Sequence, residues 1–247
     1  MALAVVHSRA LSGMLATEVT VEVHLANGPP GFSLVGLPEE EVREARERIR
    51  VALQNSRFDF PARRTTVNMA PVDLPKDATR FDLPIAIGIL AASGQIPAQV
   101  LEKFEFAGEL SLSGELRPVL GVLAMISAVS KRAQERQPRG FIVPMDNADE
   151  AALVGGVPIY PAKTLRQVVS HLEFAAGNAK GQQIPERFAQ VRLSPPAYPD
   201  YFDVKGQATA RRALEIAAVG GHSVLMVGPP GTGKTMLAQR FAGLLPP

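Results

Sequence analysis

The sequence predicts an α/β protein, more specifically a mixed α+β fold in which helices cover a mixed sheet. Apolar residues alternate with polar ones along residues 19–25, which is typical of a half-buried strand. After Pro38 the apolar residues recur at helical spacing instead. Strand and helix patterns then alternate as far as residue 175, and this alternation predicts one layered domain.

The first half of this domain contains clear strand and helix patterns. Val42, Ala45, Ile49 and Leu53 mark a helix that opens with three glutamates, which suit the positive end of the helix dipole. Pro84 fits the first turn of a buried helix. The predicted elements are strands at 19–25, 32–37 and 65–70, a helix at 39–56, a loop at 71–82 and a helix at 83–93.

The second half continues the alternation. Residues 104–119 predict two strands joined at Ser113-Gly114. Asp146 or Asn147 is the expected N-cap of the helix that follows the apolar run at 140–144. The remaining predicted elements are a helix at 121–136, a strand at 140–144, a helix at 146–154, a strand at 157–162 and a helix at 164–175.

A change in composition near Gly177 predicts a domain boundary. The stretch that follows is polar and then rich in proline, so we place a linker at 176–197 between a domain at 1–175 and a segment at 198–247. In that segment the pattern predicts a helix at 207–219 and an apolar strand at 222–228.

Composition narrows the class of protein. The 247 residues are 46% hydrophobic, which is enough for a sizeable core, and the net charge of +2 gives no argument for nucleic acid or membrane by itself. The absence of cysteine removes disulfides and thiolate metal sites, and the four histidines share no ligand spacing. No secretory signal or bilayer-length apolar run is visible, so we expect a soluble, cytoplasmic protein without a membrane partner.

The most specific motif is GPPGTGKT at residues 228–235, which matches a phosphate-binding loop at every fixed position. Its glycines let backbone N–H groups approach phosphates, Lys234 would reach the β- and γ-phosphates, and the Thr235 hydroxyl would ligate Mg²⁺. ATP and Mg²⁺ are therefore the expected cofactors. The alternative is a glycine-rich turn with an accidental lysine. The predicted nucleotide-binding residues are Gly228, Pro229, Pro230, Gly231, Thr232, Gly233, Lys234 and Thr235.

The loop alone does not predict a complete ATPase. Twelve residues follow Thr235, which leaves no room for a later acidic strand or an arginine finger. We therefore expect no catalytic residues here, and we expect residues 198–247 to be poorly packed in isolation because they lack partner strands.

The run FDVKGQATARRALEIAAVGGHSVLMVGPPGTGKTMLAQR at 202–240 resembles the start of the AAA+ domain of magnesium-chelatase-like ATPases. Together with GLPEEEVREARERIRVAL, NMAPVDLPKDATRFDLPIAIGILAASG and FAGELSLSGELRPV, the whole chain resembles the ComM/YifB family. In that family a Lon-protease-like domain precedes the AAA+ domain. The resemblance implies a hexameric ATP-driven motor, and ComM members are implicated in DNA branch migration during natural transformation.

The resemblance to Lon raises the hypothesis of a serine–lysine protease. In the run Lys76-Asp77-Ala78-Thr79-Arg80, Arg80 stands at the position that the resemblance gives to the serine. The helix expected to carry the lysine begins GVLAM at 121–125, with no lysine before Lys131. Arginine cannot act as the nucleophile, and leucine or methionine cannot act as its base. Residues 1–175 therefore resemble a Lon-like domain that lacks the catalytic dyad.

Several charged and aromatic groups leave alternatives open. Arginines on the predicted helix could contact DNA phosphates, or could pair with the glutamates between them, which the interleaving favours. Lys76 with Arg80 is a second DNA candidate. The helix arginines are Arg43, Arg46, Arg48 and Arg50, with Arg63 and Arg64 nearby, and the glutamates are Glu39, Glu40, Glu44 and Glu47.

Other groups favour structural roles. Asp73, Asp77 and Asp82 could bind Mg²⁺, although turn and capping roles are favoured. Phe58 and Phe60 could stack on bases, but such pairs more often anchor a loop to the core. By resemblance only, the segment 205–207 lies near the adenine.

Three functions stay open at this point. The first is the N-terminal part of a DNA-acting AAA+ motor that forms a homo-hexamer when complete. The second is the ATPase subunit of a magnesium chelatase, and the third is a non-enzymatic oligomerisation or interaction module.

Overall fold

The computed structural model describes residues 2–35, 39–71, 78–132, 138–188 and 198–245. The chain divides into two compact units, residues 1–191 and residues 192–247. Each unit is described by itself.

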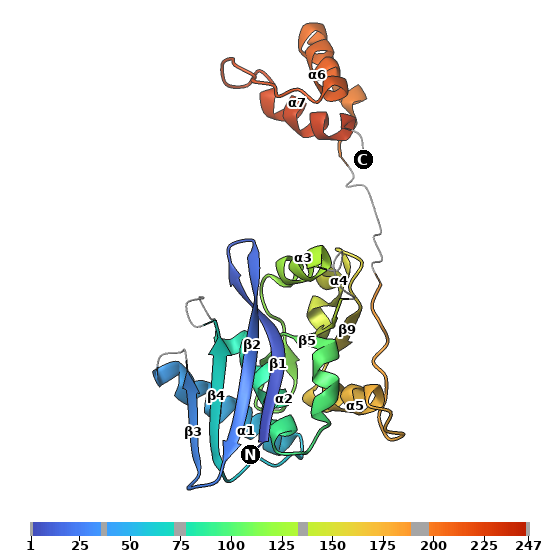
Figure 1. The fold of residues 1–247 in the computed structure, drawn as a ribbon. Helices are drawn as coiled ribbons and strands as arrows, with labels where there is room; N and C mark the ends of the chain where they lie inside the picture. Colours follow the sequence, from blue (N-terminus) through green and yellow to red (C-terminus); the bar gives the residue numbers. More distant parts are fainter. Residues whose placement is uncertain (1, 36–38, 72–77, 133–137, 189–197, 246–247) are drawn as a thin grey trace. The chain divides into compact units, whose positions relative to one another are not determined.

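Unit 1 is built on a seven-stranded mixed sheet with the order β3-β4-β2-β1-β5-β8-β9 (Figure 1). β2 pairs antiparallel with β1 and β4, whereas β3–β4, β1–β5, β5–β8 and β8–β9 are parallel. The predicted mixed sheet is therefore confirmed. The strands are β1 (Ala2–Ser12), β2 (Leu15–Ala26), β3 (Gly31–Val35), β4 (Arg64–Ala70), β5 (Phe104–Phe106), β8 (Gly140–Pro144) and β9 (Ile159–Ala162), with a separate hairpin of β6 (Glu109–Leu110) and β7 (Leu116–Arg117).

A long hairpin of β1 and β2 forms the middle of the sheet. Its register runs from Ala2 opposite Leu25 to Ser12 opposite Leu15. In β2 the predicted period of two is confirmed, because Val19, Val21 and Val23 are fully buried. The sequence patterns gave no strand over β1, because its buried positions carry small or polar residues as well as valine.

Helices cover both faces of the sheet around β5, β8 and β9. Helices α1 (Glu39–Asn55), α2 (Asp82–Ala92) and α5 (Leu165–Ala175) enclose the larger core, and α3 (Val122–Arg132) and α4 (Ala148–Ala152) enclose the smaller one. Strand β8 serves both cores, since Ile142 belongs to the first, and Phe141 and Val143 to the second. A strand buried on both faces explains the continuous apolar run at this position.

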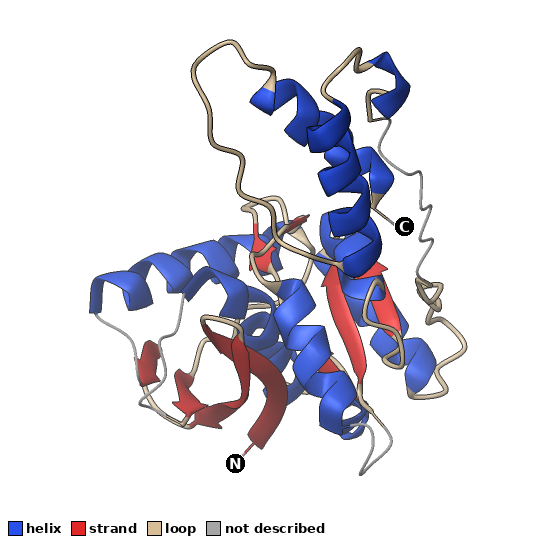
Figure 2. Cartoon of the chain, turned by 90° about the horizontal axis from the view of Figure 1, so that it is seen from above, coloured by secondary structure: helices blue, strands red, loops and turns tan. Residues whose placement is uncertain are grey.

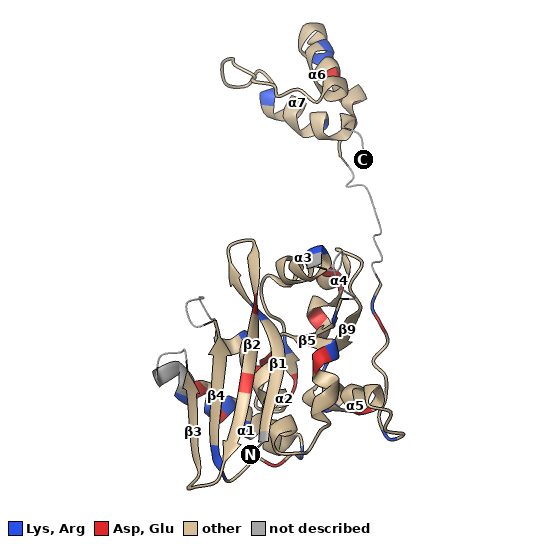
Figure 3. Cartoon of the chain, viewed as in Figure 1, with Lys and Arg blue, Asp and Glu red and all other residues tan. Residues whose placement is uncertain are grey.

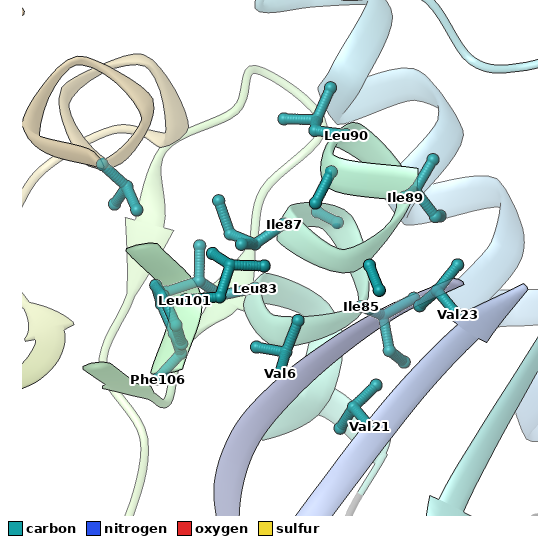
Figure 4. Close-up of a cluster of buried hydrophobic side chains, with 14 of the residues drawn as sticks. Val6, Val21, Val23, Leu83, Ile85, Ile87, Ile89, Leu90, Leu101 and Phe106 are labelled. Carbon is teal, nitrogen blue, oxygen red and sulfur yellow. The ribbon is translucent and has the colours of Figure 1, made fainter. Parts of the chain in front are cut away.

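Helix α2 is the centre of the larger core, and all of its residues are buried. It packs against β1 and β2, with Ile85 near Val6, Val21 and Val23, whereas Ile87 lies beside Leu83 and Leu101 (Figure 4). A Cβ placed on Gly88 would lie 2.5 Å from Val23 Cγ2. The helix therefore needs glycine here to approach the sheet.

A buried ion pair links β1 to β5. The Arg9 guanidinium donates to both oxygens of Glu105 at 2.7 and 2.9 Å, and both residues are almost fully buried. The Ser8 hydroxyl donates to the Phe106 carbonyl at 2.7 Å. The backbone register between these two strands consists of one pair, His7 opposite Glu105. Side chains thus carry much of the connection at this place in the sheet.

The segment predicted as a helix at 146–154 is shorter and begins differently. A 3₁₀ turn, η3 (Met145–Asn147), precedes α4. Asn147 is the N-cap residue, as predicted, but its side chain makes no capping hydrogen bond to the helix. Its amide instead exchanges two hydrogen bonds with the backbone of Val119, at 3.0 and 2.9 Å.

Two further 3₁₀ turns lie in unit 1, η1 (Ala78–Phe81) and η2 (Ala98–Lys103). The first occupies part of the segment predicted as a loop at 71–82. The predicted turn at Ser113-Gly114 joins β6 to β7. After α5, the chain to residue 188 packs on this unit, because Ile184 is buried and its N–H donates to His171 Nδ1 at 3.1 Å.

The described part of unit 2 contains helices and loops and no strand (Figure 2). Its helices are α6 (Ala208–Gly220) and α7 (Lys234–Phe241), with 3₁₀ turns η4 (Tyr201–Asp203) and η5 (Ala242–Leu244). The strand predicted at 222–228 is wrong for this chain: no described segment pairs with it, and Leu225 and Val227 are 88% and 87% exposed. Apolar patterning alone does not make a strand without a neighbour to accept its hydrogen bonds.

Candidate nucleotide-binding site

The residues of the predicted phosphate-binding loop form a turn that leads directly into α7. Gly231 and Gly233 have φ values of +83° and +80°, a left-handed conformation that glycine adopts without strain. Gly233 is the N-cap residue of α7, and Lys234 and Thr235 open the helix. The glycines of the motif are therefore required by the backbone of the turn itself.

Lys234 folds back over the loop that precedes it. Its Nζ donates to the carbonyl oxygens of Gly228 and Pro229, both at 2.7 Å, and lies 3.3 Å from Thr232 Oγ1. Within the described ranges, no carboxylate forms an ion pair with this ammonium group. A positive charge held only by neutral oxygens at the N-terminus of a helix favours an anion such as phosphate.

Two hydroxyl groups flank the lysine. Thr232 Oγ1 donates to the Pro229 carbonyl at 2.9 Å and closes the turn. Thr235 is exposed in the first turn of α7, so its hydroxyl is accessible as a ligand for a metal ion. These residue types fit a magnesium nucleotide: glycine-rich backbone for the phosphates, an ammonium for their charge and a threonine oxygen for the cation.

Gln207 connects this loop to α6. Its Nε2 donates to the Thr232 carbonyl at 2.8 Å, and its own backbone is left-handed with φ +50°. The sequence had singled out the segment 205–207 by resemblance only. In the structure, Gln207 holds the turn through this hydrogen bond, although its left-handed backbone is unfavourable for a residue other than glycine.

A small cluster fixes α7 behind the loop. Leu237 of α7 packs with Leu214 of α6 and with Tyr201 and Val204 of the preceding turn. Arg240 ties the other end of α7 to η4, with its Nε donating to the Asp200 carbonyl at 3.1 Å. The loop therefore stands on a local scaffold of two helices.

The positions that would carry a Lon-type dyad hold no nucleophile or base. Arg80 lies in η1 and is buried, so it is not a surface phosphate contact either. Leu123 lies in the first turn of α3, and its N–H donates to Glu150 Oε1 at 3.0 Å. Lys76, Asp73 and Asp77 lie outside the described residues.

Asp82, the third aspartate of the suggested group, is committed to an ion pair. Its two oxygens accept from Arg48 at 3.0 and 3.2 Å, and one also accepts from the Leu110 N–H at 3.3 Å. In the ranges that the structure describes, no three His, Asp or Glu side chains gather closely enough to bind a metal ion. Among the described helices, none combines the length and apolar character that crossing a bilayer requires.

The helix arginines divide into two kinds. Arg48 faces inward to Asp82, whereas its contact with Glu44 is long, at 3.9 Å. Arg50 and Glu47 are 4.0 Å apart, so Arg48 and Arg50 make only long contacts with the glutamates Glu44 and Glu47. Phe58 and Phe60 both pack on the core, which confirms that they anchor their loop.

The sequence did not predict two of these features. One is the Arg9–Glu105 ion pair, which could have been suspected because each of two apolar runs contains one charged residue. The other is the pair of hydrogen bonds between Asn147 and Val119, because the sequence pattern around Asn147 indicated only a helix cap.

Comparisons with known proteins agree with these observations. Residues 21–147, about half of the chain, match the family model described as subunit ChlI of Mg-chelatase. Residues 200–247, which include the loop, match the model described as magnesium chelatase, subunit ChlI. The chain therefore belongs to the Mg-chelatase ChlI family.

Within this family the chain is a homologue of the ComM and YifB proteins. It is 52% identical to competence protein ComM of Haemophilus influenzae, over 100% of this chain and 47% of the relative. It is 48% identical to the uncharacterised YifB of Salmonella typhimurium, with the same coverage. The chain thus spans about half the length of the curated relatives it matches.

A part of the chain also resembles a protease. Over 82 residues it is 35% identical to an archaeal Lon protease of Archaeoglobus fulgidus, a match that covers 33% of this chain and 11% of that protein. The predicted resemblance to Lon is confirmed over this stretch.

Proposed function

We propose that the chain is the N-terminal part of an ATP-driven AAA+ motor that acts on DNA. Residues 1–175 form a Lon-like domain without a catalytic dyad, 176–197 link it onward, and 198–247 begin the motor domain. The complete protein assembles as a homo-hexamer in the cytoplasm. Homology to a competence protein and to the chelatase family supports this proposal.

The observation that carries the proposal is the arrangement around Lys234. Its ammonium group contacts two backbone carbonyls and has no acidic partner among the described residues. Exchanging two neutral acceptors for phosphate oxygens gives stronger, charge-assisted hydrogen bonds. The same region falls within the second family match.

Each residue of the loop has a role in this proposal. The backbone from Gly228 to Gly233 surrounds the phosphates, Lys234 neutralises their charge and Thr235 holds the cation. Bound Mg²⁺ would neutralise phosphate charge as the terminal phosphoryl group is transferred. Gln207 keeps the turn in the shape that these contacts need.

A magnesium chelatase subunit is the second candidate, because both family models carry that description. Its ATP chemistry would use the same loop. The two candidates differ in what stimulates turnover, since only a DNA motor responds to DNA.

The test is Lys234→Ala in the complete protein, with Lys180→Ala as a matched control. Lys180 is an exposed lysine of unit 1 and lies outside the loop and outside the segment 205–207. We expect K234A to lose most Mg-ATP affinity in calorimetry and most ATP turnover, while K180A keeps both. Unchanged turnover in K234A would defeat the nucleotide assignment. Turnover that ignores DNA but responds to a porphyrin and Mg²⁺ would select the chelatase.

A further inference from the structure

A cleft of about 250 Å³ opens at the edge of the sheet in unit 1. The start of β3, the second half of α1 and the segment that leads into β4 form its walls. We call it the Arg/Phe cleft. It is lined by Pro30, Gly31, Phe32, Arg46, Arg50, Gln54, Phe60, Pro61, Ala62 and Arg63.

Three arginines give this cleft a positive charge. Among the described residues, Arg46 and Arg63 form no ion pair, and Arg50 has only the long contact with Glu47 at 4.0 Å. No acidic residue lines the cleft. Although basic and acidic residues interleave along α1 (Figure 3), the charges that face this space are therefore of one sign.

Arg46 presents a donor that the protein itself does not use. Its Nε is buried and has no hydrogen-bond partner within the described part of the chain. A buried donor without an acceptor costs roughly 1–3 kcal/mol, so such a group calls for an explanation. An anion in the cleft would supply the acceptor.

Two aromatic rings complete the lining. Phe32 of β3 and Phe60 are half-buried, with ring centroids 6.4 Å apart and planes tilted by 41°. Both rings rest on the hydrophobic core with one side and line the cleft with another. A firmly seated ring beside guanidinium groups is the combination that binds a base and its phosphate.

We infer that the Arg/Phe cleft binds a nucleotide unit of single-stranded DNA, with the base against Phe60 or Phe32 and the phosphate on the arginines. This inference rests on the proposed function and adds a DNA contact outside the motor domain. The volume falls just below the roughly 300–1,000 Å³ of pockets for drug-sized ligands, which suits one nucleotide. In a duplex the base faces are already stacked, so a single strand fits better.

A second hollow of about 320 Å³ shares the segment 61–63 with the cleft. Asp59 lines it, and Arg63 is its only basic residue among the described ones. A carboxylate there disfavours phosphate, so the contact is confined to the Arg/Phe cleft.

The test measures binding of a labelled twenty-residue oligothymidylate to the 247-residue chain by fluorescence anisotropy. The variant R46Q/R50Q/R63Q is compared with R117Q/R166Q/R212Q, which removes the same charge from exposed positions elsewhere. We expect the cleft variant to bind roughly tenfold or more weakly, and its log–log salt slope to fall by about 0.7, which is the contribution of one phosphate contact on a single strand. The matched variant should stay within about twofold of wild type.

Phe60→Leu tests the stacking and leaves the charges intact. We expect affinity to fall roughly fivefold or more, because stacking on one base is worth about 1 kcal/mol at least. Circular dichroism checks that each variant is folded. If the triple variant unfolds, the single variant Arg63→Glu, which changes an exposed side chain, replaces it in the binding test. R63E should also weaken binding.

Four results would overturn the inference: cleft variants that bind as tightly as wild type, equal loss in both triple variants, duplex binding as tight as single-strand binding with F60L unaffected, or competition by free thymidine monophosphate at the same nucleotide concentration. The last result would assign the cleft to free nucleotides. If wild type and the cleft variants bind DNA equally well, the assignment of the DNA contact to the cleft is refuted. The proposed DNA function is then unaffected. If the wild-type chain binds no DNA with or without Mg-ATP, this result counts against the proposed DNA function, and the cleft inference that rests on it falls as well.

Discussion

Arg48 and Asp82 form a two-point ion pair between α1 and α2, with hydrogen bonds of 3.0 and 3.2 Å. The carboxylate is fully buried, whereas the guanidinium is 23% exposed. Burial raises the pKa of Asp82 to about 6, although the hydrogen bond and charge of Arg48 oppose that rise. The pair therefore joins two helices and makes their packing sensitive to pH.

The first prediction concerns the pH dependence of unfolding. A pKa of about 6 in the folded state, above the unfolded value, means that the folded chain holds more protons between about pH 4 and 6. Asp82 by itself should therefore lower the unfolding free energy by up to about 3 kcal/mol as pH rises through that window. Burial lowers the pKa of His171 to about 4, which contributes in the opposite direction, so the Asp82 contribution is read as a difference between variants. Urea titrations followed by circular dichroism should show an unfolding free energy that rises more steeply with pH in Asp82→Asn than in wild type.

The second prediction removes the cation. Arg48→Met leaves a buried carboxylate without its partner, which costs about 3–5 kcal/mol at pH 8. The loss should be smaller at pH 5, where Asp82 can take up a proton. The double variant R48M/D82N should recover much of the stability at pH 8. Equal losses for R48M at both pH values would contradict this account.

The third prediction concerns Gly88. An alanine Cβ would lie 2.5 Å from Val23 Cγ2 and 3.4 Å from Val6 Cγ2, and both neighbours are short and buried. Overpacking of this kind costs about 1–3 kcal/mol, offset in part by the better helix propensity of alanine. Chemical denaturation of Gly88→Ala should show the loss. Gly31→Ala, whose Cβ would meet nothing closer than 4.0 Å, should stay close to wild type.

The fourth prediction concerns Asn147, whose amide both donates to and accepts from Val119. Asn147→Asp removes the donor and buries a charge, so it should cost about 2–3 kcal/mol at pH 7. At pH 4 the protonated acid regains a donor, and the loss should shrink. Asn178→Asp, at an exposed position, should show no such dependence on pH in the same denaturation series.

The fifth prediction separates strain from hydrogen bonding at Gln207. Gln207→Ala loses the contact with Thr232 and keeps an unfavourable left-handed backbone, whereas Gln207→Gly loses the contact and relieves the strain. Q207A should lower the stability of unit 2 by about 1 kcal/mol more than Q207G. Amide exchange of Thr232 and Gly233 provides the measurement. Identical exchange in the two variants would show that the backbone stores no strain.

Much of unit 1 follows from the sequence, because long periodic segments report burial directly. Strand β2 and helix α1 follow from spacings of two and of three to four residues. Strand β1 does not, since residues such as Ser8 and Arg9 are buried in it through specific partners and not through hydrophobicity. A pattern of residue types cannot reveal a partner almost a hundred positions away.

The candidate sites divide in the same way. The phosphate-binding loop is a local motif, so eight consecutive residues were enough to predict it. The Arg/Phe cleft combines β3, α1 and the segment before β4, and its existence depends on the parallel pairing of β3 with β4. The sequence supplied the arginines and phenylalanines, but only the fold shows which of them face the same space.

The sheet of unit 1 has an unusual seam where β1 meets β5. To one side the strands are mostly antiparallel, and to the other all are parallel. Between them, β1 and β5 are joined by one backbone pair, the Arg9–Glu105 bridge and the hydrogen bond from Ser8 to the Phe106 carbonyl. A guanidinium and a carboxylate thus perform a task that elsewhere falls to a ladder of amides. Neutralising either one should therefore loosen the pairing of β1 with β5 first, while the larger core, which contains Val6 of β1 and Phe106 of β5, still holds the two parts of the sheet together.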